Sequence, residues 1–294
     1  MYSKILVPLD GSKPAEQALP YARLLAEATG AAVELLRITD SDVQALLGAA
    51  AASDYLKETA VRGFSARTNV ACAELAGKPA ESIVDHAKSD ANCLIIMATH
   101  GASGVRRWLI GSIALKVIQA TSNPLWLVRA NGDASAAPEI GIRSLVVALD
   151  GSELAESVLG PSIELAQLLS SEIVLARAWE LPASAYYRSA DEPGAAMFIP
   201  SYEQLVGSVR GEAADYLASK LTELRARGVV NVRAETLEGS AADQIMGLAS
   251  ATPGSVIVMC THGRSGLTRW VLGSVSETVL RHAHNPVLIM RAAI

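Results

Sequence analysis

Residues 99–112 have the sequence THGASGVRRWLIGS, and residues 261–274 repeat it as THGRSGLTRWVLGS. Each copy follows an apolar run, at 94–97 or 256–259, that is typical of a buried strand, and each ends where a helical pattern begins. A glycine-bearing loop between a strand and a helix N-terminus suits phosphate binding, because backbone N–H groups can point at the anion and the helix dipole favours negative charge. The repeat therefore predicts two similar strand–loop–helix units, each with a candidate phosphate site.

A second landmark is also duplicated: ILVPLDGS at 5–12 returns as LVVALDGS at 145–152. The interval from this landmark to the glycine loop is longer in the second copy, and the additional residues fall mostly in an irregular stretch near 180–203. A run of small and polar residues separates the two copies. The predicted organisation is a first domain at 1–130, a linker at 131–141, and a second domain at 142–294 with an insertion near 180–203.

Within each half, short apolar runs alternate with stretches of helical spacing, which is typical of a parallel sheet with both faces covered. We expect strands at 5–9, 33–38, 70–75, 94–97 and 124–129, and in the second half at 145–149, 173–178, 230–237, 256–260 and 286–291. Pro20 predicts a kink or a late start in the first helix, whereas 154–169 is expected to form one helix. The fold class is therefore α/β, with two tandem doubly wound, Rossmann-like domains that each carry a five-stranded parallel sheet.

The aspartate after the first strand and the glycine loop after the fourth lie at carboxyl ends of strands in both halves. In doubly wound sheets the ligand lies beyond these ends, where the strand order reverses. If the first and fourth strands are neighbours, Asp10 faces Gly101 across one crevice, and Asp150 faces Gly263 across the other. The alternative is that both aspartates only stabilise an Asp-Gly-Ser turn.

The Gly-Ser pairs that end the loops are the candidate phosphate ligands. Nine residues separate Gly101 from Gly111, and the same spacing recurs before Gly273. Backbone N–H groups and a serine hydroxyl could surround a phosphate here; alternatively, Ser112 only caps a helix and Gly111 relieves a tight turn. The chain has neither a Walker P-loop nor a GxGxxG fingerprint.

Charged and titratable residues of the loops have two interpretations each. His100 and His262 titrate near neutral pH and could act as general bases, or they could be hydrogen-bonded pocket residues. No nucleophile–base–orienter set accompanies them in the sequence. Arg106, Arg107 and Arg269 could reach a phosphate tail or could belong to a solvated loop.

Composition limits the other classes of function. The chain has 294 residues and a net charge of −5, which gives no support to a large nucleic-acid footprint. No apolar stretch is long enough to span a membrane. Cys72, Cys93 and Cys260 have no metal-ligand spacing, and their odd number argues against a disulfide framework. These features favour a cytoplasmic protein that binds neither nucleic acid nor membrane.

The repeated Asp-Gly-Ser turn and the glycine spacing make the chain resemble a tandem universal stress protein, with an adenine nucleotide alpha hydrolase-like fold. The ATP-binding branch of that family carries Gly-x-x-Gly, nine residues, then Gly-Ser or Gly-Thr. The nine-residue spacing holds in both halves, but Ala98 and Cys260 replace the first glycine. Because cysteine is bulkier and could crowd the ribose or phosphates, the first site is expected to be the better one.

The resemblance implies ATP, with Mg²⁺, in the crevice at the carboxyl ends of the strands. Asp10 would contact the ribose or the metal, and the backbone of Ile38 would hold the adenine edge. The pocket would be lined by Pro8, Met97, Ala98, His100 and Gly101, with Gly111, Ser112 and Ile113 on the phosphates. The second set is Ala148, Asp150, Ala178, Met259, Cys260, His262, Gly263, Gly273, Ser274 and Val275, and Asp150 is its candidate metal contact.

The resemblance also implies that the fifth strands, 124–129 and 286–291, pair across a pseudo-two-fold axis, so that one chain mimics a homodimer. Pairing of whole chains stays open. The expected function is a stress-response sensor or regulator that hydrolyses ATP slowly at most. The alternatives are a phosphohydrolase that uses the histidines, and a ligand-free interaction module.

Overall fold

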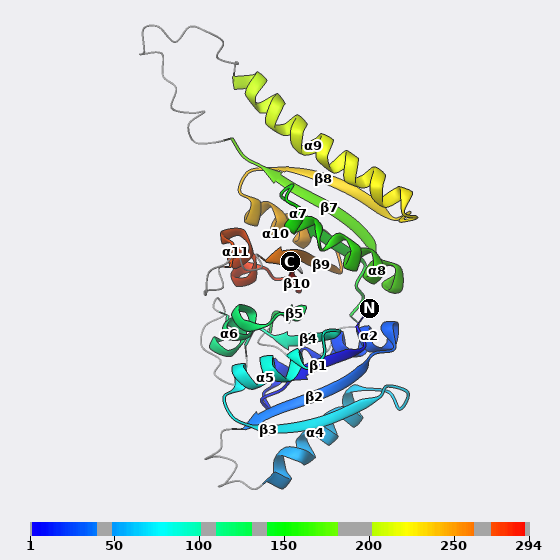
Figure 1. Ribbon diagram of the computed structural model, residues 1–294, viewed down its shortest axis with the longest axis vertical. Helices are drawn as coiled ribbons and strands as arrows, with labels where there is room; N and C mark the ends of the chain where they lie inside the picture. The colour runs from blue at the N-terminus through cyan, green and yellow to red at the C-terminus, as the bar shows by residue number, and fades with distance from the viewer. Residues whose placement is uncertain are drawn as a thin grey trace, which may run out of the picture.

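The computed structural model describes residues 2–39, 49–100, 110–130, 140–181, 202–261 and 272–291. Its strands are β1 (Lys4–Pro8), β2 (Ala32–Thr39), β3 (Val70–Ala76), β4 (Cys93–Ala98), β5 (Leu125–Val128), β6 (Ser144–Ala148), β7 (Glu172–Trp179), β8 (Val232–Glu238), β9 (Ser255–Thr261) and β10 (Val287–Arg291). They form one sheet of ten strands in the order β3-β2-β1-β4-β5-β10-β9-β6-β7-β8 (Figure 1). The expected α/β class with tandem parallel sheets is confirmed.

The two halves meet through their last strands. Every pairing within a half is parallel, whereas β5 and β10 pair antiparallel, with Leu127 opposite Val287 and Trp126 opposite Leu288. The pairing expected between the fifth strands is therefore present within one chain. It removes both of these strands from the sheet edge, which leaves β3 and β8 as the outer strands.

Helices cover both faces of the sheet. They are α1 (Lys13–Glu16), α2 (Leu19–Thr29), α4 (Ala49–Gly63), α5 (Pro79–Lys88), α6 (Ser112–Ala120), α7 (Glu153–Glu156), α8 (Leu159–Leu169), α9 (Tyr202–Ala226), α10 (Ala241–Ala251) and α11 (Ser274–His282). One core packs α1, α2, α4, α7, α8 and α9 against the first face, and a second core packs α5, α6, α10 and α11 against the other. Among the described residues, no helix combines the length and the apolar character needed to cross a bilayer.

The first helix of each half is broken in two. α1 gives way to α2 before Pro20, as expected, but the single helix expected at 154–169 is wrong, since α7 ends at Glu156 and α8 starts at Leu159. Proline supplies the reason in both halves. Pro161 has no N–H to donate to the carbonyl of Ser157, four residues earlier. Pro20 likewise has no N–H to donate to the carbonyl of Glu16.

Candidate functional site

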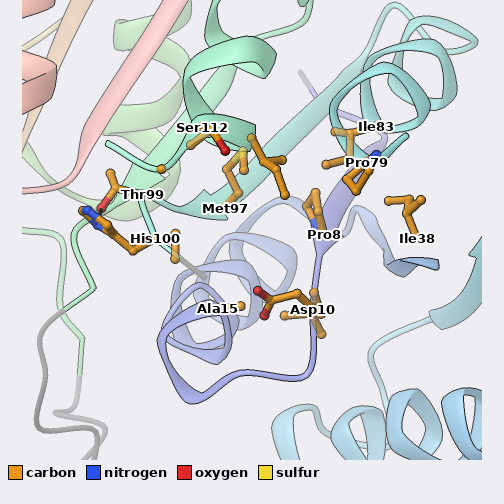
Figure 2. A pocket seen from close by; sticks show the side chains of 15 residues that line it. Pro8, Asp10, Ala15, Ile38, Pro79, Ile83, Met97, Thr99, His100 and Ser112 are labelled. Atoms are coloured by element: carbon orange, nitrogen blue, oxygen red, sulfur yellow. Dashed lines mark hydrogen bonds between the residues drawn. The ribbon is translucent and has the colours of Figure 1, made fainter. Parts of the chain in front are cut away.

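The strand order of the first half reverses between β1 and β4, and a pocket of about 280 Å³ lies beyond the carboxyl ends of these two strands. Ligand pockets commonly occur at such a switch point. The pocket is lined by Pro8, Leu9, Asp10, Ala15, Ile38, Pro79, Ile83, Met97, Ala98, Thr99, His100, Gly111, Ser112, Ile113 and Ala114 (Figure 2).

The pocket has an apolar end and a polar end. In Figure 2, Ile38, Pro79 and Ile83 lie together on one side, while Ser112 and His100 lie on the other. Asp10 lies across from Ser112 on the β1 side. The pocket therefore offers an apolar surface for a flat ring and polar groups for a charged tail.

The backbone of Ile38 is well placed at the apolar end. Leu9 donates its N–H to the carbonyl of Leu36 at 2.8 Å, so the backbone groups of Leu36 point toward β1. Backbone direction alternates along a strand, so those of Ile38 also point toward β1. The paired register of β1 and β2 ends at Pro8 opposite Leu36, and the N–H and C=O of Ile38 therefore face the crevice.

The polar end is the first turn of α6. Gly111 is its N-cap, and the structure shows no side-chain cap there. The N–H of Gly111 donates to the carbonyl of Thr99 at 2.8 Å, while the carbonyl of Gly111 accepts from Leu115. Ser112 is the first helical residue and not the N-cap, and its binding of a phosphate stays a prediction. The first N–H groups of a helix have no partner within it, and among the described residues the amides of Ser112 and the next two residues have no other backbone acceptor, so they can donate to an anion.

Asp10 holds the turn that leads from β1 into α1. Its Oδ1 accepts from the N–H of Ser12 at 3.0 Å and from the hydroxyl of Ser12 at 2.5 Å. Gly11 has φ +87°, a left-handed conformation that favours glycine. The turn interpretation of Asp10 is therefore confirmed, and the same carboxylate lines the pocket.

His100 lies beside Thr99 at the carboxyl end of β4. Its Nδ1 is 3.0 Å from the hydroxyl oxygen of Thr99, and its buried Nε2 has no hydrogen-bond partner among the described residues. Burial, with a smaller contribution from the charge of Arg129, lowers the pKa of His100 below its ordinary value. Both effects favour the neutral imidazole.

The structure brings most of the expected first-half residues into this one pocket. Those that line it are Pro8, Asp10, Ile38, Met97, Ala98, His100, Gly111, Ser112 and Ile113. Gly101, Arg106 and Arg107 lie outside the described residues. The sequence interpretation missed Leu9, Ala15, Pro79, Ile83, Thr99 and Ala114. Leu9, Thr99 and Ala114 adjoin expected residues, whereas Pro79 and Ile83 enter only because α5 packs beside α6.

The second half repeats much of this geometry. Asp150 Oδ1 accepts from the N–H and the hydroxyl of Ser152 at 2.9 and 2.6 Å. Leu149 donates its N–H to the carbonyl of Ala176, as Leu9 does to that of Leu36. Ala178, two residues further along its strand, is therefore the equivalent of Ile38. The remaining expected residues of this half lie at equivalent positions: Ala148 and Met259 near strand ends, and Gly273, Ser274 and Val275 at the start of α11.

The second half differs from the first at Cys260, which stands where the first half has Ala98. Cys260 is half-buried, and its Sγ lies 3.6 Å from the hydroxyl of Ser157 and 3.4 Å from the carbonyl of Thr261. Its side chain packs against the core on the α7 side of the sheet. His262, Gly263 and Arg269 lie outside the described residues. The weaker second site stays a prediction.

Comparison with known proteins gives the family. The universal stress protein family model matches residues 1–129 and again residues 141–291. The chain belongs to the universal stress protein family. It is 27% identical over 149 residues to universal stress protein MJ0531 of Methanocaldococcus jannaschii, a match that covers 51% of this chain and 82% of that protein.

A longer match supports the tandem arrangement. The chain is 25% identical over 206 residues to universal stress protein Rv2005c of Mycobacterium tuberculosis, covering 67% of this chain and 61% of that protein. Among solved structures, a universal stress protein from Archaeoglobus fulgidus superposes with a TM-score of 0.73 at 17% identity, and the match covers 100% of both chains. At that identity the likeness shows the fold of the whole chain.

Proposed function

We propose that this universal stress protein binds ATP in the pocket between β1 and β4, and at the equivalent position of the second half, as a stress-response sensor or regulator. The observation that carries the proposal is the first turn of α6, which has no side-chain cap among the described residues and lies across the pocket from Asp10. An anion at that turn would accept from backbone N–H groups at the positive end of the helix dipole.

Each end of the pocket has a counterpart in the nucleotide. The adenine ring would lie against Ile38, Pro79 and Ile83, with its edge on the N–H and C=O of Ile38. An N–H beside a C=O matches the acceptor and donor of the adenine edge, and it opposes the reversed pattern of guanine. Asp10 would accept from the ribose hydroxyls. We therefore expect ATP to bind in preference to GTP.

A divalent ion would arrive with the nucleotide. The described residues contain no group of three or more His, Cys, Asp or Glu side chains placed to hold a metal. Mg²⁺ commonly binds through one or two carboxylates together with substrate phosphates. Asp10 is the carboxylate that lines the pocket and is the residue that would contact it.

The test is to identify what the protein carries and binds. Nucleotide released from the denatured, purified full chain is analysed by mass spectrometry, and calorimetry is run with ATP, GTP and adenosine. The proposal expects adenine nucleotide in the released fraction and tighter binding of ATP than of GTP. It is wrong if no adenine nucleotide is released and calorimetry with millimolar ATP shows no heat of binding; the chain then acts as a ligand-free module.

A further inference from the structure

Two equivalent arginines cross the junction between the halves. Arg129 follows β5 and donates through Nη1 to the carbonyls of Arg281 and Ala283, at 2.7 and 3.5 Å. Arg291 ends β10 and donates through Nη2 to the carbonyls of Ile118 and Gln119, at 2.9 and 3.1 Å. Each arginine therefore belongs to one half and holds the C-terminus of the last helix of the other half.

The antiparallel pairing of β5 with β10 creates this exchange. It places the carboxyl end of each strand beside the end of the helix that precedes the other strand. The last carbonyls of a helix have no partner within it, and a cation is favoured at that end of the dipole. Burial lowers the pKa of Arg129 below its ordinary value and that of Arg291 to about 10. Both contacts are partly removed from water. A hydrogen bond from a charged donor is stronger in such a place than in water.

The helix that Arg291 holds is the one whose other end forms the polar end of the pocket. α6 runs from Ser112, which lines the pocket, to Ala120, a length of about 13 Å. Figure 1 shows α6 and α11 on either side of the junction between β5 and β10. A short helix moves as a rigid body, so a shift at Gln119 also displaces the amides at Ser112.

We propose that Arg291 is a positioning residue for the phosphate-binding helix of the first half, and that Arg129 has the same role for α11 of the second half. The inference rests on the proposed function, since it concerns the phosphate end of that site. Each nucleotide site is then completed by a residue of the opposite half, which adds to the contacts that each half makes with its own helix, such as those of Asn123 with the carbonyls of Asp90 and Cys93.

Arg291 gives the cleaner test of the two. Arg129 lies close enough to His100 for its charge to lower the pKa of that imidazole, so a change there also affects the first pocket directly. Arg291 is not among the residues that line the first pocket. An effect of Arg291 on that pocket is therefore indirect, and its hydrogen bonds to Ile118 and Gln119 make α6 the expected route.

The experiment titrates the full chain with ATP and with adenosine and follows amide hydrogen exchange in the first turns of α6 and α11. Arg291→Ala is expected to raise, by about three- to tenfold, the ATP concentration that gives half-maximal protection of the amides in the first turn of α6. The affinity for adenosine, measured by calorimetry, should stay unchanged, since adenosine has no phosphate to contact α6. Arg291→Lys should restore part of the ATP affinity, because an ammonium can still donate to a carbonyl. The matched control is Arg225→Ala, which removes an exposed arginine from the end of α9.

Several results would overturn the inference while the proposed function stands: an effect limited to α11, an equal loss for adenosine, or an ATP affinity like that of Arg225→Ala. If Arg291→Ala does not fold, Arg291→Lys carries the test with an intermediate loss. If ATP protects no amides in the parent protein, the proposed function and the inference are both wrong. If the parent and Arg291→Ala bind ATP equally, only the inference is wrong.

Discussion

The N–H of Gly111 donates to the carbonyl oxygen of Thr99 at 2.8 Å, which ties the start of α6 to the end of β4. A Cβ atom at Gly111 would lie 3.0 Å from that same oxygen. The backbone of Gly111 has φ −58°, which any residue can adopt, so close approach is the reason for glycine here. Its role is to let the helix start approach the strand, and the free amides that follow it face the pocket.

Gly111→Ala should therefore displace the start of α6. We expect the free energy of unfolding to fall by about 1–3 kcal/mol, since the carbonyl of Thr99 is backbone and cannot swing away. ATP affinity at the first pocket should fall by about tenfold or more. Denaturant unfolding and calorimetry measure the two effects. Gly160→Ala is the control, because a Cβ there meets no atom within 4 Å. Equal behaviour of the two variants would contradict the packing argument.

Local sequence patterns predicted the central strands of this fold, such as β1, β4 and β5, because each is a continuous apolar run. Ile5, Leu6 and Val7 are fully buried in β1, and such a run has only one arrangement that covers both faces. The turn after β1 was also readable, since Asp10, Gly11 and Ser12 each have a local reason to be there. Residues that lie next to these signals in the sequence line the same pocket in the structure.

What the sequence could not predict depends on packing between distant segments. Ile83 reaches the pocket because α5 packs beside α6, and no local pattern around Ile83 indicates a ligand. The contact of Arg291 with the carbonyl of Gln119 depends on the antiparallel pairing of β5 with β10, two strands that lie far apart in the sequence. The break between α7 and α8 was not predicted, because the apolar spacing of 154–169 is helical throughout and the break depends on Pro161.

Asp10→Asn distinguishes the role of Asp10 in the turn from its proposed role in ligand binding. The amide oxygen of asparagine can still accept from Ser12, so the free energy of unfolding should change by no more than about 0.5 kcal/mol. A neutral acceptor binds a ribose hydroxyl more weakly than a carboxylate does, so we expect the affinity for adenosine to fall about five- to tenfold. The affinity for ATP should fall by a similar factor without Mg²⁺ and by more with it, because Asp10 is also the proposed metal contact. Calorimetry with both ligands tests this. An unchanged affinity for both would restrict Asp10 to the turn.

Exchanging Ala98 and Cys260 tests the predicted difference between the two sites. Cys260→Ala gives the second half the residue of the first, and Ala98→Cys does the reverse. We expect Cys260→Ala to strengthen ATP binding at the second site and Ala98→Cys to weaken the first, each by about tenfold, as for a small change of volume against a ligand. Site-resolved hydrogen exchange at α6 and α11 measures both. No gain at the second site would remove the reason for ranking the halves.

Trp126 should couple the stability of the two halves. It is fully buried in β5, opposite Leu288, and its ring centroid lies 6.1 Å from that of Tyr21. Trp126→Ala should lower the free energy of unfolding by about 3–5 kcal/mol. Trp126→Phe is the control with the smaller loss, because Nε1 of Trp126 has no hydrogen-bond partner among the described residues. Denaturant unfolding is expected as one transition in the parent; two separate transitions would show that the junction does not couple the halves.

His100 should make the protein less stable in acid. Burial and the charge of Arg129 lower its pKa in the folded state, so on acidification the unfolded chain takes up a proton first, near pH 6.5. Below that pH the unfolded state is favoured, and stability falls until the pH passes the folded-state pKa. His100→Gln removes this contribution, and the difference in Tm between pH 7.5 and pH 5.5 should be smaller than in the parent. His282→Gln changes an exposed histidine of α11 and serves as the control. If His100→Gln and the parent lose the same stability between these two pH values, the burial argument for His100 is wrong.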